Sequence, residues 1–256
     1  MRKRFGGLMV KRLSANLVLD SGLVVNSYTF KTHLPVGGLK FTLRRLQDLE
    51  VDEVIILNTS HSNDPVKDFN VILEDIDSWH IATPLSYGGG IKVLGDAVGI
   101  IKAGAERVVV SLNVLLDSDV FFEICSYLGD QALILHLPLE FKENKLVVRG
   151  NNSIGLKSIM DLLPNRWGGE IMFSFVANDG AKTPNWQNIS TALDSTIGST
   201  NIIISGGFTN SEDITRGLTL EQVSAVAVGN YLHQKELSVI NLKRDVGTNI
   251  ELRRAR

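Results

Sequence analysis

The sequence predicts an α/β protein, a single (β/α)8 TIM barrel that covers residues 1–256 as one domain. Two observations lead to this prediction. Eight short apolar runs alternate with eight stretches of helical pattern, which is typical of parallel strands joined by right-handed crossover helices. A pattern of strand, Gly-rich turn and helix is also written twice, at 87–91 (YGGGI) and 204–208 (ISGGF), about half a chain length apart. An internal repeat of this period predicts a closed barrel made of two similar halves rather than an open sheet.

The predicted strands are short runs rich in Val, Ile and Leu, such as 53–57 (EVIIL) and 201–205 (NIIIS). Asp64-Pro65 and Ser211-Glu212-Asp213 mark helix starts, because each supplies a capping side chain followed by Pro or acids in the first turn. We expect strands near 13–19, 53–57, 82–87, 107–111, 131–137, 170–175, 201–205 and 224–228. We expect helices near 38–50, 65–78, 93–103, 115–128, 153–163, 186–196, 211–219 and 235–244. Residues 140–148 (EFKENKLVV) interrupt the alternation and predict a hairpin after the fifth strand.

Composition limits the class of protein. The chain is 44% hydrophobic with a formal net charge of −2, which gives no sign of a nucleic-acid or membrane partner. Its basic start is followed by an apolar run, 7–10, too short for a signal peptide. The single Cys125 excludes an internal disulfide, and without a Cys/His cluster we expect no metal and no cofactor. The sequence therefore predicts a cytoplasmic enzyme or enzyme subunit.

The chemistry of a (β/α)8 barrel lies at the carboxyl ends of its strands. There the repeated Gly turns, together with Asp179-Gly180, predict anion binding through backbone N–H groups. Carboxylates are scarce at the same strand ends, where Asn58 and Pro138 stand and Asp20 is an exception. The sequence therefore favours phosphate recognition over proton transfer.

An ordered set of short motifs runs through nearly the whole chain: 11–13 (KRL), 52–54 (DEV), 88–91 (GGGI), 104–107 (GAER), 179–180 (DG), 205–207 (SGG) and 247–250 (GTNI). In this order and spacing the chain resembles the cyclase subunit of imidazole glycerol phosphate synthase, a barrel of histidine biosynthesis that works with a glutaminase. The related isomerase barrel of the same pathway resembles it less. The resemblance implies the same fold, a glutaminase partner and a phosphate-bearing ligand.

The resemblance also implies where catalytic residues should stand, and this sequence departs from it there. The family's general acid and base are aspartates at the ends of strands one and five, and these positions hold Val18 and Pro138. A further aspartate of the family corresponds to Asn58. Because each proton-transfer group contributes roughly 10²–10⁴ in rate, we expect cyclase activity to be lost and name no catalytic residue. Asp20 and His136 are the alternatives, although we expect His136 to be a hydrogen-bonded residue of the barrel interior.

The phosphate-binding positions implied by the resemblance are mixed. In the first half Gly90 is present, but Ser111-Leu112 replaces the family's Asn-Thr pair, which puts the second phosphate site in doubt. The second half keeps its set. The expected phosphate-binding residues are Gly90, Ser111, Asp179, Gly180, Ser205, Gly206, Gly207, Gly229 and Asn230.

The opposite end of the barrel carries four charges at strand starts: Arg12, Glu53, Arg107 and Glu170. In the family the matching positions form a salt-bridged ring through which ammonia enters the barrel, and Glu106 matches a position that contacts the glutaminase. Each charge alone could be a solvated strand start. All four charges are present although the expected carboxylates at the carboxyl ends of the strands are missing. This combination favours a functional role for the amino-terminal end of the barrel.

Together these features look like the glycosyl amidation-associated branch of the family, found in surface-polysaccharide gene sets. The hypothesis is a barrel that docks and activates a glutaminase and passes ammonia to an ATP-dependent sugar amidotransferase. Two alternatives remain: a true cyclase subunit with rearranged acids around Asp20, and a phosphosugar-binding scaffold.

Overall fold

The computed structural model describes residues 10–74, 81–143, 145–164, 167–181, 183–196, 200–234, 238–247, 250 and 252. Eight parallel strands form a closed barrel. In order these are β1 (Arg12–Asp20), β4 (Glu53–Asn58), β5 (Leu85–Gly88), β6 (Arg107–Ser111), β7 (Leu133–Lys142), β10 (Glu170–Phe175), β11 (Asn201–Ser205) and β12 (Val223–Val228). The barrel closes because β1 pairs with both β4 and β12, and β7 pairs with both β6 and β10. The predicted TIM-barrel fold is confirmed.

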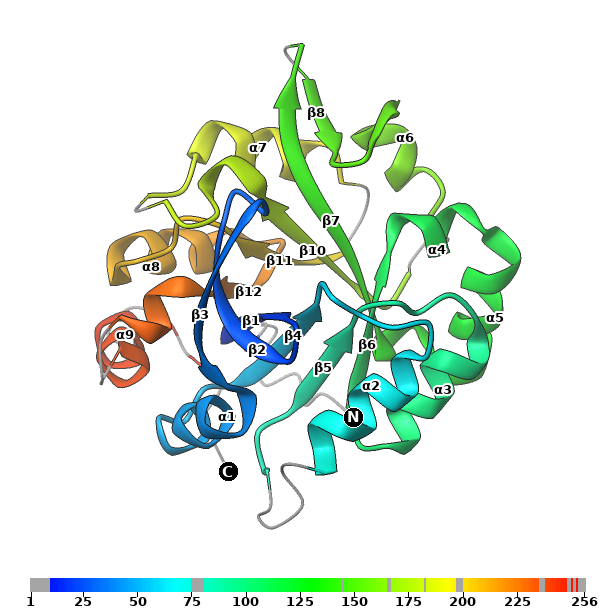
Figure 1. The fold of residues 1–256 in the computed structure, drawn as a ribbon. Coiled ribbons are helices and arrows are strands. Elements are labelled where there is room, and N and C mark those ends of the chain that lie inside the picture. Colours follow the sequence, from blue (N-terminus) through cyan, green and yellow to red (C-terminus); the bar gives the residue numbers. More distant parts are fainter. Residues whose placement is uncertain are drawn as a thin grey trace.

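Helices surround the strands (Figure 1). They are α1 (Leu39–Asp48), α2 (Pro65–Glu74), α3 (Leu94–Lys102), α4 (Leu112–Leu116), α5 (Ser118–Leu128), α6 (Leu156–Met160), α7 (Trp186–Asp194), α8 (Ser211–Thr219) and α9 (Ser238–Val246), with 3₁₀ turns η1 (Asp130–Ala132), η2 (Val176–Asn178) and η3 (Asn230–His233). The predicted start of α8 has a side-chain cap one residue earlier, since Asn210 Oδ1 accepts the Asp213 N–H at 2.8 Å. Parts of the predicted helices near 65–78 and 235–244, and Thr248-Asn249 of the tail, lie outside the described residues.

Two apolar clusters stabilise the barrel. The larger lies between the strands and the helices, where alternate strand residues such as Leu13 and Ile56 meet helix residues such as Leu43. The smaller fills the barrel interior with Ile55, Val109, Ile134, Met172, Ile203, Ala225 and Ala227. Because side chains of a strand alternate between its faces, the strands β4, β6, β7, β10, β11 and β12 contribute to both clusters. The interior is therefore packed and apolar at mid-height.

Two antiparallel extensions rise from equivalent strands of the two half-barrels. β1 continues into β2 (Leu23–Tyr28) and β3 (Thr32–Gly38), and β7 continues into β8 (Lys145–Val148) and β9 (Asn151–Gly155). In Figure 1 the β7–β8 hairpin extends outward at the top, and the β2–β3 hairpin lies in front of the barrel strands. The pairing of β7 with β8 confirms the hairpin predicted at 140–148. The β2–β3 hairpin was not predicted, because the apolar run 23–25 is short and its partner 32–38 carries Pro and Gly.

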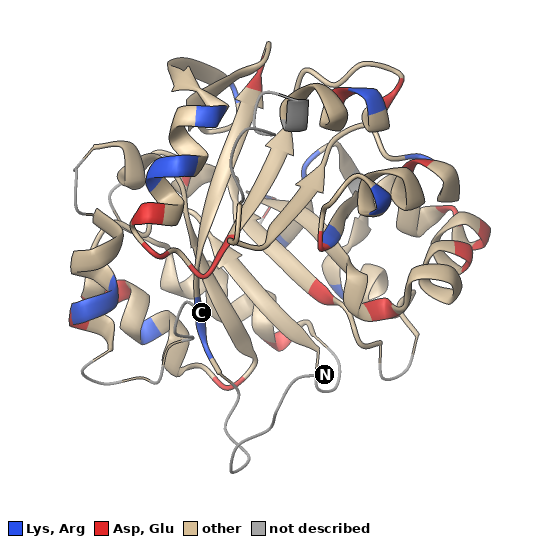
Figure 2. Cartoon of the chain, turned by 90° about the horizontal axis from the view of Figure 1, so that it is seen from below, with Lys and Arg blue, Asp and Glu red and all other residues tan. Residues whose placement is uncertain are grey.

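The surface and the helix lengths complete the description. Basic and acidic residues are interspersed over the helices in the view of Figure 2. Within the described residues no helix is both long and apolar enough to span a bilayer. The same part of the chain holds no group of three or more His, Cys, Asp or Glu side chains suited to a metal.

Candidate functional site

Four charged side chains meet inside the amino-terminal end of the barrel. Arg12, Glu53, Arg107 and Glu170 are the first residues of β1, β4, β6 and β10, and all are at most 8% exposed. Arg12 Nε donates to Glu53 Oε1 at 3.2 Å, and its Nη2 donates to Glu170 Oε2 at 2.7 Å. Arg107 Nη2 donates to Glu53 Oε2 at 2.5 Å, while its Nη1 donates to Glu170 Oε2. The four charges thus form a closed ring, called the charge ring below, in which each carboxylate joins both arginines.

Two serines complete the charge ring. Ser14 Oγ donates to Glu53 Oε1 at 2.5 Å, and Ser224 Oγ donates to Glu170 Oε1 at 2.9 Å. Burial opposes ionisation of Glu53, but the charges of Arg12 and Arg107 outweigh it and lower the pKa of this carboxyl. The Glu53 carboxylate is therefore ionised at neutral pH. With two arginines and two glutamates, the charge ring has no formal net charge.

Above the charge ring the barrel axis is lined mostly by the interior apolar cluster, and Asn16 is one of the buried polar residues beside it. Asn16 follows Arg12 and Ser14 on the inward face of β1 and is 8% exposed. Its side-chain Oδ1 is buried without a hydrogen-bond partner among the described residues. A buried acceptor without a partner is costly, so Asn16 is suited to a small donor that enters the axis.

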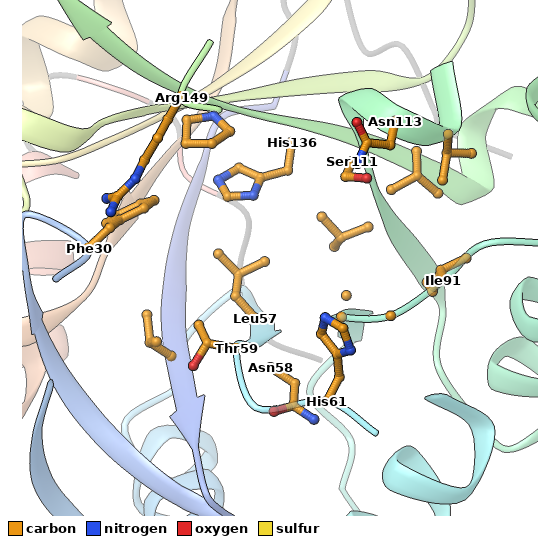
Figure 3. Close-up of a pocket in the computed structure, with 18 of the residues that line it drawn as sticks. Phe30, Leu57, Asn58, Thr59, His61, Ile91, Ser111, Asn113, His136 and Arg149 are labelled. Atoms are coloured by element: carbon orange, nitrogen blue, oxygen red, sulfur yellow. The ribbon is translucent and has the colours of Figure 1, made fainter. Parts of the chain in front are cut away.

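A pocket of about 750 Å³ opens at the carboxyl ends of the strands. It lies about 20 Å from the charge ring along β1, as the six residues from Arg12 to Val18 imply. One wall of the pocket consists of the Gly-rich turn after β5 together with Ser111 and Asn113. Phe30 and Arg149 lie on the opposite side (Figure 3). The Arg149 guanidinium stands over the Phe30 ring, 5.8 Å from its centroid. A cavity of this size and mixed lining suits a small molecule.

The two family acid positions face this pocket. Val18 and Pro138 both line it, and neither side chain can transfer a proton. Asn58 also lines it, and its Nδ2 donates to the Tyr87 hydroxyl at 3.0 Å. His136 also lines the pocket, and its Nε2 lies 2.9 Å from Ser174 Oγ. It is therefore the hydrogen-bonded interior residue that we expected. Burial lowers the pKa of His136 to about 4, so its imidazole is neutral at pH 7.

Of the predicted phosphate residues, Gly90 and Ser111 line the pocket. Gly89 and Gly90 adopt φ of 138° and 74°, and a Cβ at Gly89 would lie 2.5 Å from Asn58 O. This turn therefore requires glycine. The His61 ring packs against Gly90 at the same place.

The second-half phosphate residues do not line this pocket, and the β2–β3 hairpin lies against three of them, Asp179, Gly180 and Asn230. Asp179 Oδ2 accepts from Ser27 Oγ at 2.6 Å and from the Phe30 N–H at 3.0 Å. The Asn230 side chain accepts a hydrogen bond from the Ser27 N–H at 3.1 Å and donates one to the Ser27 carbonyl at 2.7 Å. Gly180 is in contact with Tyr28. These residues anchor the hairpin, and phosphate binding at the second-half set of Asp179, Gly180, Ser205, Gly206, Gly207, Gly229 and Asn230 stays a prediction.

One polar pair at the pocket was missed in the sequence. Asp20, the last residue of β1, lies with its Oδ2 2.8 Å from Nδ1 of His33, which lines the pocket. The position of Asp20 at a strand end was a signal, but His33 could not be placed without the hairpin. Glu106 is exposed directly before Arg107, at the rim beside the charge ring.

A family model described as histidine biosynthesis protein matches residues 18–238 of this chain. The chain belongs to the histidine biosynthesis protein family. Three similar proteins are the imidazole glycerol phosphate synthase subunit HisF of Dictyoglomus turgidum, 26% identical over 93% of this chain and 95% of its own length, that of Bacillus subtilis, 26% identical over 95% and 100%, and a putative imidazole glycerol phosphate synthase subunit hisF2 of Vibrio vulnificus, 27% identical over 94% and 91%. The family match includes Val18 and Pro138 and covers most of the barrel. That these two residues stand where the family has its acids stays a prediction.

Proposed function

We propose that this chain is the ammonia-conducting subunit of a glutaminase-dependent amidation complex. Its amino-terminal face would dock and activate a glutaminase, and ammonia would enter the barrel through the charge ring. The observation that carries the proposal is the contrast between the two barrel ends. A closed charge ring lies at one end, while Val18 and Pro138 occupy the proton-transfer positions at the other.

The charge ring has little reason to exist for stability alone. A buried ion pair costs desolvation energy that its attraction barely offsets, and apolar residues of similar volume serve as well or better. Its position at the start of the axis suggests a gate, because four side chains from four strands must separate or rotate to open it. Glu106 on the adjacent rim would contact the docked glutaminase.

The interior above the gate suits neutral ammonia. The apolar layer of Ile55, Val109 and Met172 disfavours a charged ammonium, whose transfer into an apolar medium is costly. Asn16 Oδ1 would accept a hydrogen bond from ammonia as it passes. Ammonia released at the pocket would be shielded from dilution and protonation in water.

The onward reaction is the finer part of the proposal. Without acids at Val18 and Pro138, the ammonia would pass to an ATP-dependent sugar amidotransferase of surface-polysaccharide (O-antigen type) biosynthesis in the cytoplasm. The pocket would hold a phosphate-bearing molecule at Gly90 and Ser111.

Partner activation is tested by glutamine hydrolysis. The chain, mixed with a glutaminase subunit from the same organism, should raise the rate of glutamine hydrolysis. Glu106→Lys should weaken this activation, whereas Glu212→Lys, the same change at an exposed acid in the first turn of α8 at the opposite end of the barrel, should not. A glutaminase rate that is the same with and without the chain would refute the docking proposal.

The rival function is cyclisation in the pocket of this chain, and the match to imidazole glycerol phosphate synthase subunits favours it. An assay of ammonia-dependent cyclisation with the histidine-pathway intermediate separates the two. We expect no turnover above background. Turnover at rates typical of the family would replace the amidation proposal with a cyclase.

A further inference from the structure

The Asp20–His33 pair brings a carboxylate and an imidazole together beside the pocket. Asp20 ends β1, and His33 lies on β3, which reaches the same place by way of β2. The side chains are 37% and 20% exposed, and His33 lines the pocket. The pair therefore joins the barrel rim to the hairpin at a position that a bound ligand would reach.

The geometry fixes which ring nitrogen of His33 is free. Hydrogen bonds from His33 and then from Ser21 lower the pKa of Asp20, so this carboxylate is ionised at neutral pH and acts only as an acceptor. His33 Nδ1 must therefore carry the proton that it shares with Asp20. Nε2 is left with its lone pair and has no hydrogen-bond partner in the described part of the chain. A carboxylate that orients an imidazole in this way also stabilises the imidazolium formed when Nε2 takes a proton.

The other histidines of the pocket are less suited to this role. His136 already uses Nε2 for Ser174, and burial lowers its pKa to about 4. His61 bonds the Ser62 carbonyl through Nδ1, 3.2 Å away, and has no carboxylate partner. Among the described histidines that line the pocket, His33 alone combines a free Nε2 with a carboxylate.

The pocket offers an anion site away from His33. Lys92 lines it and makes no ion pair within the described residues, and it follows the Gly turn that includes Gly90. Figure 3 shows Ile91, the neighbour of Lys92, on the side of the pocket opposite Phe30. Phe30 belongs to the hairpin that carries His33. A ligand whose anionic group meets Lys92 would thus present its other end toward His33.

We propose that His33, oriented by Asp20, is the hydrogen-bond acceptor of this pocket for a phosphorylated sugar whose phosphate lies near Lys92 and the Gly turn. A hydroxyl of the sugar donates a hydrogen bond to Nε2, and its O–H bond stays intact in the bound complex. Asp20 remains ionised and holds the imidazole in the tautomer that accepts this bond. This role goes beyond ammonia conduction and does not depend on it, because it needs neither the charge ring nor a glutaminase.

The test is NMR of the complete chain with ¹⁵N-labelled histidine, which distinguishes protonated from unprotonated ring nitrogens. In the wild-type protein, neutral His33 should carry its proton on Nδ1, and Asp20→Asn should shift the proton toward Nε2. The His61 signals serve as an internal control and should not change tautomer. A wild-type His33 that is protonated on Nε2 would overturn the proposal without any variant.

Ligand binding is measured with ribose 5-phosphate as the probe, against ribose and inorganic phosphate. Ribose 5-phosphate should move the Nε2 signal of His33, and ribose alone should not. Lys92→Ala should weaken its binding by roughly tenfold or more, since the phosphate loses a charged hydrogen bond. Absence of any response at His33 to saturating ribose 5-phosphate would overturn the ligand assignment. A response to inorganic phosphate equal to that of ribose 5-phosphate would do so too, because the sugar would then have no part in it.

Discussion

Removing one carboxylate from the charge ring should destabilise the protein strongly. Glu170 is 2% exposed and accepts hydrogen bonds from Arg12 Nη2 at 3.0 and 2.7 Å, from Arg107 Nη1 and from Ser224 Oγ at 2.9 Å. The Glu170→Gln substitution keeps the shape but leaves two buried guanidinium groups with one carboxylate. The ring would change from neutral to a net charge of one.

The magnitude follows from burial. Breaking a buried ion pair by removal of one partner costs about 3–5 kcal/mol, because the charge left behind is neither solvated nor paired. For a protein of this size each kcal/mol lowers Tm by about 2–4 °C, so Glu170→Gln should melt roughly 6–20 °C below the wild type. Adding Arg107→Met restores neutrality and leaves Arg12 paired with Glu53. The double variant should therefore be more stable than Glu170→Gln alone.

Thermal unfolding followed by circular dichroism measures these differences. Arg244→Gln is the matched control, because its ion pair with Asp245 is exposed, with side chains 70% and 46% accessible. We expect this control to change stability by at most about 1 kcal/mol. The reasoning is refuted if Glu170→Gln melts with the control, or if the double variant is no more stable than the single one.

Two further predictions concern the turns and the buried histidines. Gly207→Ala should lower the free energy of unfolding in urea by about 1–3 kcal/mol, because φ is 81° and an added Cβ would collide with the Thr183 carbonyl. Gly95→Ala in α3, where an added Cβ meets open space, should be neutral or stabilising. Equal effects of the two substitutions would contradict this prediction. Burial lowers the pKa of His136 to about 4, so unfolded chains take up its proton first and stability should fall by about 3 kcal/mol between roughly pH 6.5 and 4. His233 acts with the same sign. Urea melts of His136→Gln should show a smaller loss over this range, and an unchanged pH profile would argue against it.

The fold was predictable because its signals are local and repeated. Eight apolar runs between helical patterns lead to a closed barrel once the motif at 87–91 recurs at 204–208. The β2–β3 hairpin was not predictable in this way, because Pro35 and two glycines make β3 look like a loop. Pairing with β2 and the anchoring by Asp179 and Asn230 make it a strand, and these contacts join residues about 150–200 positions apart.

The candidate site was likewise predictable only in part. That Arg12, Glu53, Arg107 and Glu170 would meet was implied by the resemblance to the family. Their places at the starts of four strands explain it, since a barrel brings those starts together around one axis. Closure of the barrel fixes which face of each strand points toward the axis, and these four side chains lie on that face.

The pocket depended instead on a loop. Its open part lies beside the Gly turn after β5, although the second half keeps more of the expected phosphate residues. The hairpin lies against that half, because Asp179 and Asn230 accept hydrogen bonds from its Ser27. The same hairpin brings His33 within 2.8 Å of Asp20. One unpredicted element thus both covers part of the expected second-half anion site and places the Asp20–His33 pair beside the open pocket, so residues 23–38 shape the carboxyl end of the barrel in a way that the internal repeat does not reveal.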